Sequence, residues 1–354
     1  MLPQQWETFK RAAHLEKLDE IPMALIVDSP WIPGYLGISH LDYYLDPEVW
    51  FQANLKIVRE FPDIIFVPSW WMEYGMAAEP SVLGTKIKFW QDATPSECHT
   101  LYRLEDIGQF PEYEVEKDGF AALTLHRIKM QRRRILDLGY ILPMVTSRGP
   151  LCMAGFVRGT TNLMMDLVEN PEGAHQLIDL CTRVVIDWLK AQHEAIGDTV
   201  ESIFVLDDIV GFMGKRHYLE FAHPYLKRIC DAFPSDWVKL YHNDAEIGAC
   251  LEHLPDAGFT VLNWGKQKNI REVKRRVGGR ICLMGNVNPL EIGVRGTAEE
   301  VKRATEDVLE GSGGEGIILS VGGGASPGMP RENILAMLEA LKEFNARRVA
   351  LREA

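Results

Sequence analysis

Short apolar segments alternate with longer segments of helical character along almost the whole chain. Eight of the short segments are rich in Ile, Val and Leu and contain few polar residues, which is typical of strands buried on both faces of a parallel sheet. The eight predicted strands are residues 22–27, 64–68, 141–146, 202–206, 238–241, 260–263, 280–284 and 316–321.

The segments between the predicted strands carry apolar residues at helical spacing. Residues 173–196 repeat apolar side chains along one stripe, as expected for a helix that packs on a sheet. Residues 297–311 begin with the capping-box pair Thr297 and Glu300 and end at Gly311, which are typical start and stop signals of a helix. These segments therefore predict helices that follow the strands.

Eight strands, each followed by a helix, predict one (β/α)8 (TIM) barrel domain over residues 1–354. The connection between the second and third strands, residues 69–140, is long, so we expect an inserted segment there that covers the barrel mouth. A barrel of this kind builds its catalytic face from residues just past each strand. Nearly all of those residues are polar, aromatic or glycine: Asp28, 69–71, 147–150, Asp207, Asp208, 242–244, 263–264, 285–289 and 322–324.

Two of these strand ends concentrate ionisable groups. Asp207 and Asp208 follow the fourth strand, and His242 and Asp244 follow the fifth. Burying such groups is unfavourable unless they pair, bind a metal or take part in catalysis. Successive strand residues point to opposite faces, so at most one of Asp207 and Asp208 faces the barrel axis. The structural alternative for this pair is capping of the turn before Gly211.

His242 and Asp244 are separated by one residue, so both side chains face the same way if the strand continues. An imidazole with a carboxylate can bind zinc or act as an acid–base pair. A metal site would need a third ligand, which would come from Asp207, from Asp208 or from the last strand. The structural alternative for Asp244 is an N-cap of a following helix.

Two further features predict contact with a ligand. The glycine-rich segment 322–328, which contains Gly323, lets backbone approach a ligand closely; a tight turn is the alternative. Trp70 and Trp71 predict an aromatic pocket wall, with lid packing as the alternative. The GxGxxG match at 311–316 precedes a strand instead of following one, so we assign it to a helix end and loop.

Composition excludes several classes of function. The 354 residues carry a formal net charge of −12, which disfavours a general nucleic-acid binder. The six cysteines form no CxxC pair, so neither a zinc knuckle nor a redox motif is expected. No signal peptide and no apolar run near the ~18 residues of a membrane span is visible. We expect a cytoplasmic enzyme that acts on a small molecule.

Several motifs resemble the uroporphyrinogen decarboxylase superfamily, whose members are (β/α)8 barrels that include the decarboxylase and corrinoid-dependent methyltransferases. Their order and spacing extend over roughly residues 20–346. The motifs are Arg148-Gly-Pro150, Asp207-Asp208, Pro224-Tyr-Leu-Lys-Arg228, Gly285-Asn-Val-Asn-Pro289, and residues 322–324 with Pro327, Pro330, Glu332 and Asn333.

The chain departs from the decarboxylase pattern at the expected substrate site. That pattern has an arginine-containing Arg-Gln-Ala-Gly-Arg-Tyr segment after the first strand, whereas residues 28–35 contain no arginine. The acidic residue expected after the second strand is replaced by Ser69 or Trp70, and the expected tyrosine after the third strand falls at Phe156. A tetrapyrrole with many carboxylates needs basic partners, and Arg148 is the main one here. Uroporphyrinogen itself is therefore not the expected substrate.

The chain also departs from the methyltransferase pattern, which places zinc ligands in a His-x-Cys motif after the fifth strand and a Gly-Cys-Gly motif after the eighth. His242 matches the histidine, but Asp244 and Gly323 stand at the two cysteines. A thiolate zinc site is therefore excluded. A site of His242, Asp244 and Asp208 would be rich in oxygen and would suit a harder or less tightly held divalent metal, with zinc still open.

The resemblance implies a methyltransferase that moves a methyl group between a small methylated substrate and a corrinoid protein or cofactor. His242 with Asp244 would bind a metal or protonate the leaving group, Asp207 or Asp208 would complete the site, and Arg148 would hold an anionic substrate group. The remaining predicted substrate contacts are Trp70, Trp71, Phe156, Asn286 and Gly323.

Two other functions stay open. In a decarboxylase of a small or tetrapyrrole-like acid, Arg148 would orient the carboxylate, and Asp208 or His242 would protonate the carbanion. A corrinoid- or tetrapyrrole-binding module would show no turnover. The substrate, the metal and the oligomeric state, a homodimer included, do not follow from the sequence.

Overall fold

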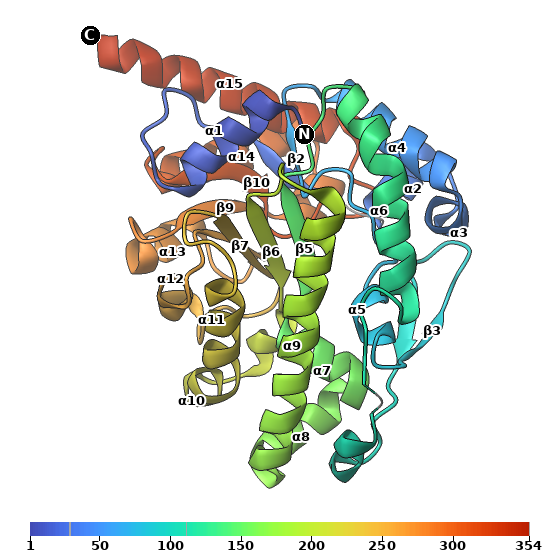
Figure 1. Cartoon of the computed structure of the whole chain (residues 1–354). Coiled ribbons are helices and arrows are strands. Elements are labelled where there is room, and N and C mark those ends of the chain that lie inside the picture. The colour runs from blue at the N-terminus through green and yellow to red at the C-terminus, as the bar shows by residue number, and fades with distance from the viewer. Residues whose placement is uncertain (28–29, 111, 354) are drawn as a thin grey trace.

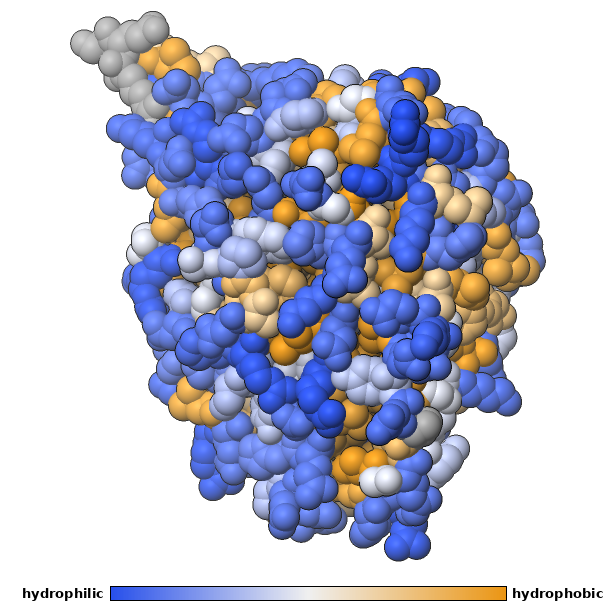
Figure 2. Space-filling view, viewed as in Figure 1, coloured by the Kyte–Doolittle hydropathy of each residue, from blue (hydrophilic) through white to orange (hydrophobic). Residues whose placement is uncertain are grey.

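The computed structural model describes residues 1–27, 30–110 and 112–353 (Figure 1). Asp28, which was expected just past the first strand, lies outside the described residues. None of the helices in the described ranges combines the length and the apolar character that a membrane crossing requires. The face in Figure 2 is mostly hydrophilic, with apolar side chains in small groups.

Eight strands in the described part of the chain run parallel. Six form one sheet in the order β10-β9-β8-β7-β6-β5, and β1 pairs with β2. Each overlaps one of the eight predicted strands. The bounds are β1 (Ala24–Ile26), β2 (Ile65–Val67), β5 (Met144–Arg148), β6 (Ser202–Leu206), β7 (Val238–Asn243), β8 (Val261–Trp264), β9 (Cys282–Val287) and β10 (Ile317–Val321).

The two sheets are joined at one edge. Parallel bridges from Met23 to Leu319 and from Ile26 to Gly324 connect β1 with β10. The described residues form no ladder between β2 and β5, so closure into a complete barrel stays a prediction. The α/β fold with a parallel sheet is confirmed.

Helices lie around the strands (Figure 1). The longer ones are α1 (Pro3–Ala13), α4 (Pro47–Glu60), α6 (Gly119–Asp137), α7 (Pro150–Arg158), α8 (Thr160–Glu169), α9 (Pro171–Ile196), α11 (His223–Asp231), α13 (Ile270–Val277), α14 (Ala298–Ser312) and α15 (Arg331–Glu353). The shorter ones are α2 (Trp31–Leu36), α3 (His40–Leu45), α5 (Ala78–Ser81), α10 (Lys215–His217), α12 (Leu254–Ala257), η1 (Leu104–Gln109), η2 (Asp208–Phe212), η3 (Tyr218–Ala222), η4 (Leu251–His253) and η5 (Pro289–Val294).

The predicted helix signals are largely present. The capping box of Thr297 and Glu300 starts α14, with both reciprocal hydrogen bonds formed. The end predicted at Gly311 is wrong, because α14 continues to Ser312 and Gly313 caps it in the left-handed conformation. A residue with that conformation at the cap is the usual helix stop, and Gly311 is helical.

The long connection after β2 contains α5, the antiparallel pair β3 (Lys86–Lys88) and β4 (Ser96–Cys98), η1 and α6. It supplies two buried carboxylates, Glu73 and Glu79, that reach the end of β5. Whether the segment covers the mouth, as expected from its length, stays a prediction.

One hydrophobic cluster gathers alternate residues from all eight parallel strands. Because side chains alternate between the two faces of a strand, residues of one parity share this interior. Trp6 and Phe9 of α1 join the cluster, and α1 lies across the amino-terminal end of the strands (Figure 1). The strand members are Ala24, Ile26, Ile65, Val67, Met144, Phe204, Leu206, Val238, Leu240, Val261, Cys282, Met284 and Ile318.

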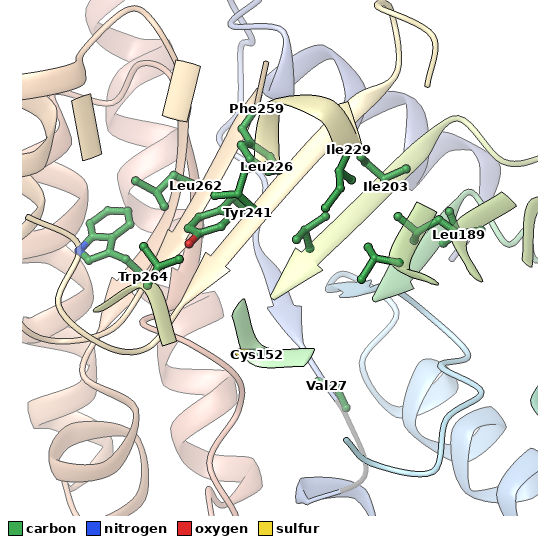
Figure 3. Packing of buried hydrophobic residues seen from close by; sticks show 14 of the residues in the cluster. Val27, Cys152, Leu189, Ile203, Leu226, Ile229, Tyr241, Phe259, Leu262 and Trp264 are labelled. Carbon is green, nitrogen blue, oxygen red and sulfur yellow. The ribbon is translucent and has the colours of Figure 1, made fainter. Parts of the chain in front are cut away.

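A second, larger cluster fills the space between the strands and the helices. Ile203, Tyr241 and Leu262 have the opposite parity and belong to it, together with Leu226 and Ile229 of α11 (Figure 3). The two clusters therefore show which alternate residues of each strand face the interior and which face the helices. The same alternation indicates which residues at the strand ends face the interior.

Candidate functional site

His242 lies at the interior end of β7. It follows Val238 and Leu240 at alternate positions, both of which belong to the interior cluster. The strand register pairs His242 with Leu206 of β6 and with Asn263 of β8. The side chain is 5% exposed. The imidazole is thus buried at the carboxyl end of the sheet, at the position expected for an active-site residue.

The imidazole is oriented by Asn263. Its Nδ1 lies 2.7 Å from Asn263 Oδ1. The amide nitrogen of Asn263 donates to the carbonyl oxygens of Met284, at 2.8 Å, and Val321, at 3.2 Å. The candidate residues chosen from the sequence omit Asn263, although the signal was present: it is the polar end of an apolar strand beside β7.

Two carboxylates lie on the other side of the imidazole. His242 Nε2 is 3.6 Å from Asp244 Oδ2 and 3.9 Å from Asp208 Oδ1. Asp208 Oδ1 also accepts a hydrogen bond from the Asp244 backbone N–H, at 2.6 Å. The side chains of Asp208 and Asp244 are 46% and 54% exposed. A buried imidazole therefore faces two carboxylates at the solvent edge.

The carboxylates set the charge of the imidazole. Burial lowers the pKa of His242, but the negative charges of Asp244 and Asp208, with the bond to Asn263, outweigh burial and raise the pKa to about 9. Burial raises the pKa of Asp244, and the imidazolium outweighs that effect and holds it below its usual range. A pKa of about 9 favours the imidazolium at neutral pH, with both carboxylates on its Nε2 side.

Asp207 has a different place from its neighbour Asp208. Asp207 directly follows Leu206, which faces the interior, so its side chain points to the opposite face, toward the helices. The side chain is fully buried. The carboxylate accepts hydrogen bonds from the backbone N–H groups of Leu151, at 3.1 Å, and Cys152, at 2.8 Å. These groups open α7, so Asp207 caps that helix from another strand. In this structure the Asp207 carboxylate is directed to the start of α7. Its predicted catalytic role stays a prediction.

The surroundings of Asp207 have electrostatic consequences. Burial raises the pKa of its carboxyl to about 7, although the hydrogen bonds from Leu151 and Cys152 favour the charged form. A Cβ at Gly149 would lie 2.3 Å from Asp207 Oδ2, so glycine is needed for the close approach of β5 and β6. The described hydrogen bonds of the Asp207 carboxylate therefore join the end of β6 to the start of α7.

Arg148, Trp71 and Glu73 form a second cluster. Arg148 ends β5, and its Nη2 lies 3.6 Å from Glu73 Oε2, with both side chains buried. The guanidinium lies 5.3 Å from the centre of the Trp71 ring. Its backbone N–H donates to Glu79 Oε1 at 2.8 Å. Neither glutamate was predicted from the sequence, because Arg148, which both contact, lies more than 60 residues further along the chain.

Trp70 does not share the position of Trp71. Its ring packs against Phe51 of α4, at 5.3 Å between centroids, and against Tyr140, at 5.6 Å. Ser69 and Trp70 both have positive φ, 75° and 54°, which turns the chain sharply after β2 and sends consecutive tryptophans to different faces. The ring of Trp70 is buried in the larger hydrophobic cluster, between the strands and the helices. Its predicted contact with substrate stays a prediction.

Gly323 is spatially tied to Asp244. It has φ 89°, and a Cβ built there would lie 2.2 Å from Asp244 Oδ1. The carboxylate therefore occupies the space that a side chain at position 323 would need. The sequence predicted that the backbone of Gly323 contacts a ligand, and that contact stays a prediction. The structure shows that Gly323 packs against the carboxylate of Asp244.

The two remaining predicted substrate contacts have other neighbours. Asn286 donates its amide to the carbonyl oxygens of Gly265, at 3.3 Å, and Lys268, at 2.8 Å. It thus holds the loop after β8. Phe156 is partly buried on α7 and packs against the helix-facing cluster. These neighbours do not test whether Asn286 and Phe156 bind substrate, so both predicted substrate contacts stay predictions.

The metal prediction rests on His242, Asp244 and Asp208. Across residues 1–27, 30–110 and 112–353, no group of three His, Cys, Asp or Glu side chains is arranged as a ligand set. The described residues therefore do not form a metal site as they stand.

Comparisons with solved structures establish the fold independently. A methyltransferase from Methanosarcina mazei has a TM-score of 0.81 and 20% sequence identity, covering 95% of this chain and 98% of its own. A B12-independent methionine synthase from Shewanella sp. W3-18-1 has a TM-score of 0.61 and 11% identity, covering 94% of this chain and 99% of its own. These likenesses show that the fold is shared.

Comparisons with curated sequences point to one family. Uroporphyrinogen decarboxylase of Danio rerio is 25% identical, over 95% of this chain and 92% of its own length. That of Coxiella burnetii (strain RSA 493 / Nine Mile phase I) is 27% identical, over 98% of this chain and 97% of its own. The model of the family described as Uroporphyrinogen decarboxylase (URO-D) matches residues 4–344. The motifs at the strand ends and this match agree, and the chain belongs to the uroporphyrinogen decarboxylase family.

Proposed function

We propose that this family member is a methyltransferase in which His242 protonates the leaving group of a small methylated substrate. The observation that carries the proposal is the buried imidazole of His242, which faces Asp208 and Asp244 through Nε2 and contacts Asn263 through Nδ1. The shared fold with a solved methyltransferase supports it. We also propose that the eight strands close into a (β/α)8 barrel whose mouth holds this cluster.

The chemistry requires an acid. When the bond between the methyl carbon and an oxygen or nitrogen breaks, the electron pair stays on the heteroatom, which is a poor leaving group unless it gains a proton. His242 Nε2–H is placed to give that proton as the charge develops. General acid catalysis of this kind contributes about 10²–10⁴-fold. Asp244 is exposed to solvent and allows the imidazole to be reprotonated.

The charges around the mouth indicate the class of substrate. Acidic groups outnumber basic ones, and Arg148 already has Glu73 as a partner. A neutral or cationic donor therefore fits better than a polyanion, which changes the expectation that Arg148 holds an anionic group. Methyl ethers and methylamines belong to this class. The groups concerned are His242 and Arg148 on one side and Asp208, Asp244, Glu73 and Glu79 on the other.

The methyl acceptor in this proposal is a corrinoid, free or on a partner protein. When bound, it supplies the nucleophilic centre that takes the methyl group. Phe212 fits such a partner, because it is 66% exposed at the end of η2, the helix that Asp208 begins. An exposed apolar ring of this kind suits the flat face of a macrocycle. The protein would act in the cytoplasm; a homodimer stays a prediction.

The test is methyl transfer to cob(I)alamin from a panel of methyl ethers, methylamines and methylated alcohols, followed by visible absorption. We expect transfer from at least one neutral or cationic donor and a loss of about 10²-fold or more in His242→Gln. His14→Gln, at an exposed histidine on the opposite end of the fold, is the matched control and should retain full activity. No transfer from any donor to cob(I)alamin, either free or on a corrinoid protein, would contradict the proposal.

Decarboxylation is the second candidate, and the names of the curated relatives favour it. In that reaction the imidazolium would protonate the carbanion left by carbon dioxide. Release of carbon dioxide from a carboxylated substrate without corrinoid, lost in His242→Gln, would replace methyl transfer as the function. Protein-bound metal that is lost in His242→Ala would instead restore the metal prediction.

A further inference from the structure

The side-chain amide of Asn263 has one orientation that satisfies its surroundings. Its nitrogen faces the carbonyl oxygens of Met284 and Val321, which can only accept hydrogen bonds. If the amide were turned over, its oxygen would face two other oxygens in a fully buried site. The oxygen must therefore face His242, and this assignment follows from the network.

The orientation of Asn263 determines the chemistry of the two imidazole nitrogens. An amide oxygen accepts but cannot donate, so Nδ1 of His242 must carry a hydrogen for the 2.7 Å contact to be a hydrogen bond. Loss of that hydrogen would place two lone pairs against each other in a buried site. Nε2, which faces Asp208 and Asp244, is then the nitrogen that can give up and regain a proton.

We infer that Asn263 is the positioning residue of this site, because it confines proton exchange by His242 to Nε2. It is fully buried and touches the imidazole from the side away from the carboxylates. It therefore acts through His242 and not on a substrate. As far as catalysis is concerned, the inference rests on the proposed role of His242 as an acid, but the state of the imidazole is measured independently of activity.

The position of Asn263 is set by three strands. Register places it beside His242 across the β7–β8 ladder. Its amide nitrogen bonds to the carbonyl groups of Met284 in β9 and Val321 in β10. The side chain of Asn263 is held by its contacts with His242, Met284 and Val321 and has little freedom to rotate. The backbone of the sheet therefore fixes the orientation of the imidazole.

The primary test is ¹⁵N NMR of the whole protein labelled at histidine, at a pH high enough to hold His242 neutral, with His242→Gln for assignment. The wild type should contain the tautomer protonated at Nδ1. A neutral His242 protonated at Nε2 in the wild type overturns the inference, whatever the activity of the protein.

Variants separate positioning from a merely structural role. Asn263→Leu removes the acceptor, and it should shift the tautomer toward Nε2–H and lower kcat about tenfold or more with a smaller change in KM. Asn263→Asp keeps the acceptor oxygen and loses the donors, so it should retain the Nδ1–H tautomer. Loss of the tautomer in both variants to the same extent would assign Asn263 a structural role only.

Asn333→Leu is the matched control. Asn333 is also a buried asparagine whose amide nitrogen donates to two backbone carbonyls, those of Gly293 and Gly296. It should leave the His242 tautomer unchanged. If the tautomer of the wild type is as inferred and no donor is turned over, the proposed function fails while the positioning of His242 stands.

Discussion

Asp244 and Gly323 share one space at the carboxyl ends of β7 and β10. A Cβ at position 323 would lie 2.2 Å from Asp244 Oδ1, and the φ of 89° adds backbone strain for any other residue. The carboxylate that raises the pKa of His242 is therefore in place only because position 323 has no side chain.

Gly323→Ala should displace the Asp244 carboxylate, lower the pKa of His242 and reduce methyl transfer at least tenfold. The expected loss of stability is about 1–3 kcal/mol, from strain alone. NMR titration of His242 and kcat/KM are the measurements. Gly139→Ala is the control, because Gly139 has φ 84° and nothing within 4 Å of its Cβ position. Equal loss of activity in both variants would show that strain, not the carboxylate, is responsible.

The raised pKa of His242 predicts a pH dependence of stability. A pKa of about 9 in the folded state, against 6.5 in the unfolded state, stabilises the fold fully below about pH 6.5 and is lost as pH rises through about 9. The shift corresponds to on the order of 3 kcal/mol. Urea unfolding of wild type and His242→Gln should therefore show a difference that shrinks between these pH values. A constant difference would mean that the imidazole is neutral at pH 7.

The same group predicts the pH profile of catalysis. Because the acid must be protonated, kcat/KM should be level at neutral pH and fall above about pH 9, where His242 loses its proton. Asp244→Asn removes the largest stabilising charge, so the fall should begin at a lower pH. A profile that rises with pH through 9 would assign His242 the role of a base.

Asp207 is predicted to matter for folding and not for chemistry. Asp207→Ala leaves the N–H groups of Leu151 and Cys152 without their acceptor, at a cost of about 2–4 kcal/mol. Asp207→Asn keeps one acceptor oxygen and should be nearly as stable and nearly as active. Thermal unfolding and kcat measure the two effects. An Asn variant that is stable but inactive would return Asp207 to the catalytic groups.

Glu73 is predicted to select against anionic substrates. Glu73→Gln removes the negative charge 3.6 Å from Arg148, and it should raise kcat/KM for carboxylated methyl donors relative to neutral ones by about tenfold, since one close charge pair is worth about 1 kcal/mol or more. Glu16→Gln, at an exposed glutamate far from the mouth, is the control. An unchanged ratio would mean that Arg148 does not contact the donor.

The sequence predicted the eight parallel strands because they are nearly continuous apolar runs. It misplaced some strand ends: β5 continues to Arg148 and β9 to Val287, through polar residues that a hydrophobic pattern excludes. These residues remain in the ladder because backbone hydrogen bonds, which do not depend on side-chain polarity, continue there.

The site was predictable in part. Period-two alternation correctly allowed only one of Asp207 and Asp208 to face the interior, but it could not say which without the parity of the whole strand. The partnership of His242 with Asn263 depends on register between strands, and that of Arg148 with Glu73 depends on the path of a long connection. Neither register nor path is encoded in a local pattern.

The strand register also sets the distance between the strands that carry Arg148 and His242. Arg148, Leu206 and His242 stand side by side on β5, β6 and β7, so the strands that carry the two cations are separated by about 10 Å. Leu206, which carries no charge, lies between them. A one-carbon donor can reach only one cation at a time, whereas a donor with an extended body can meet both. The length of the donor, and not only its charge, is therefore a variable that this sheet can select.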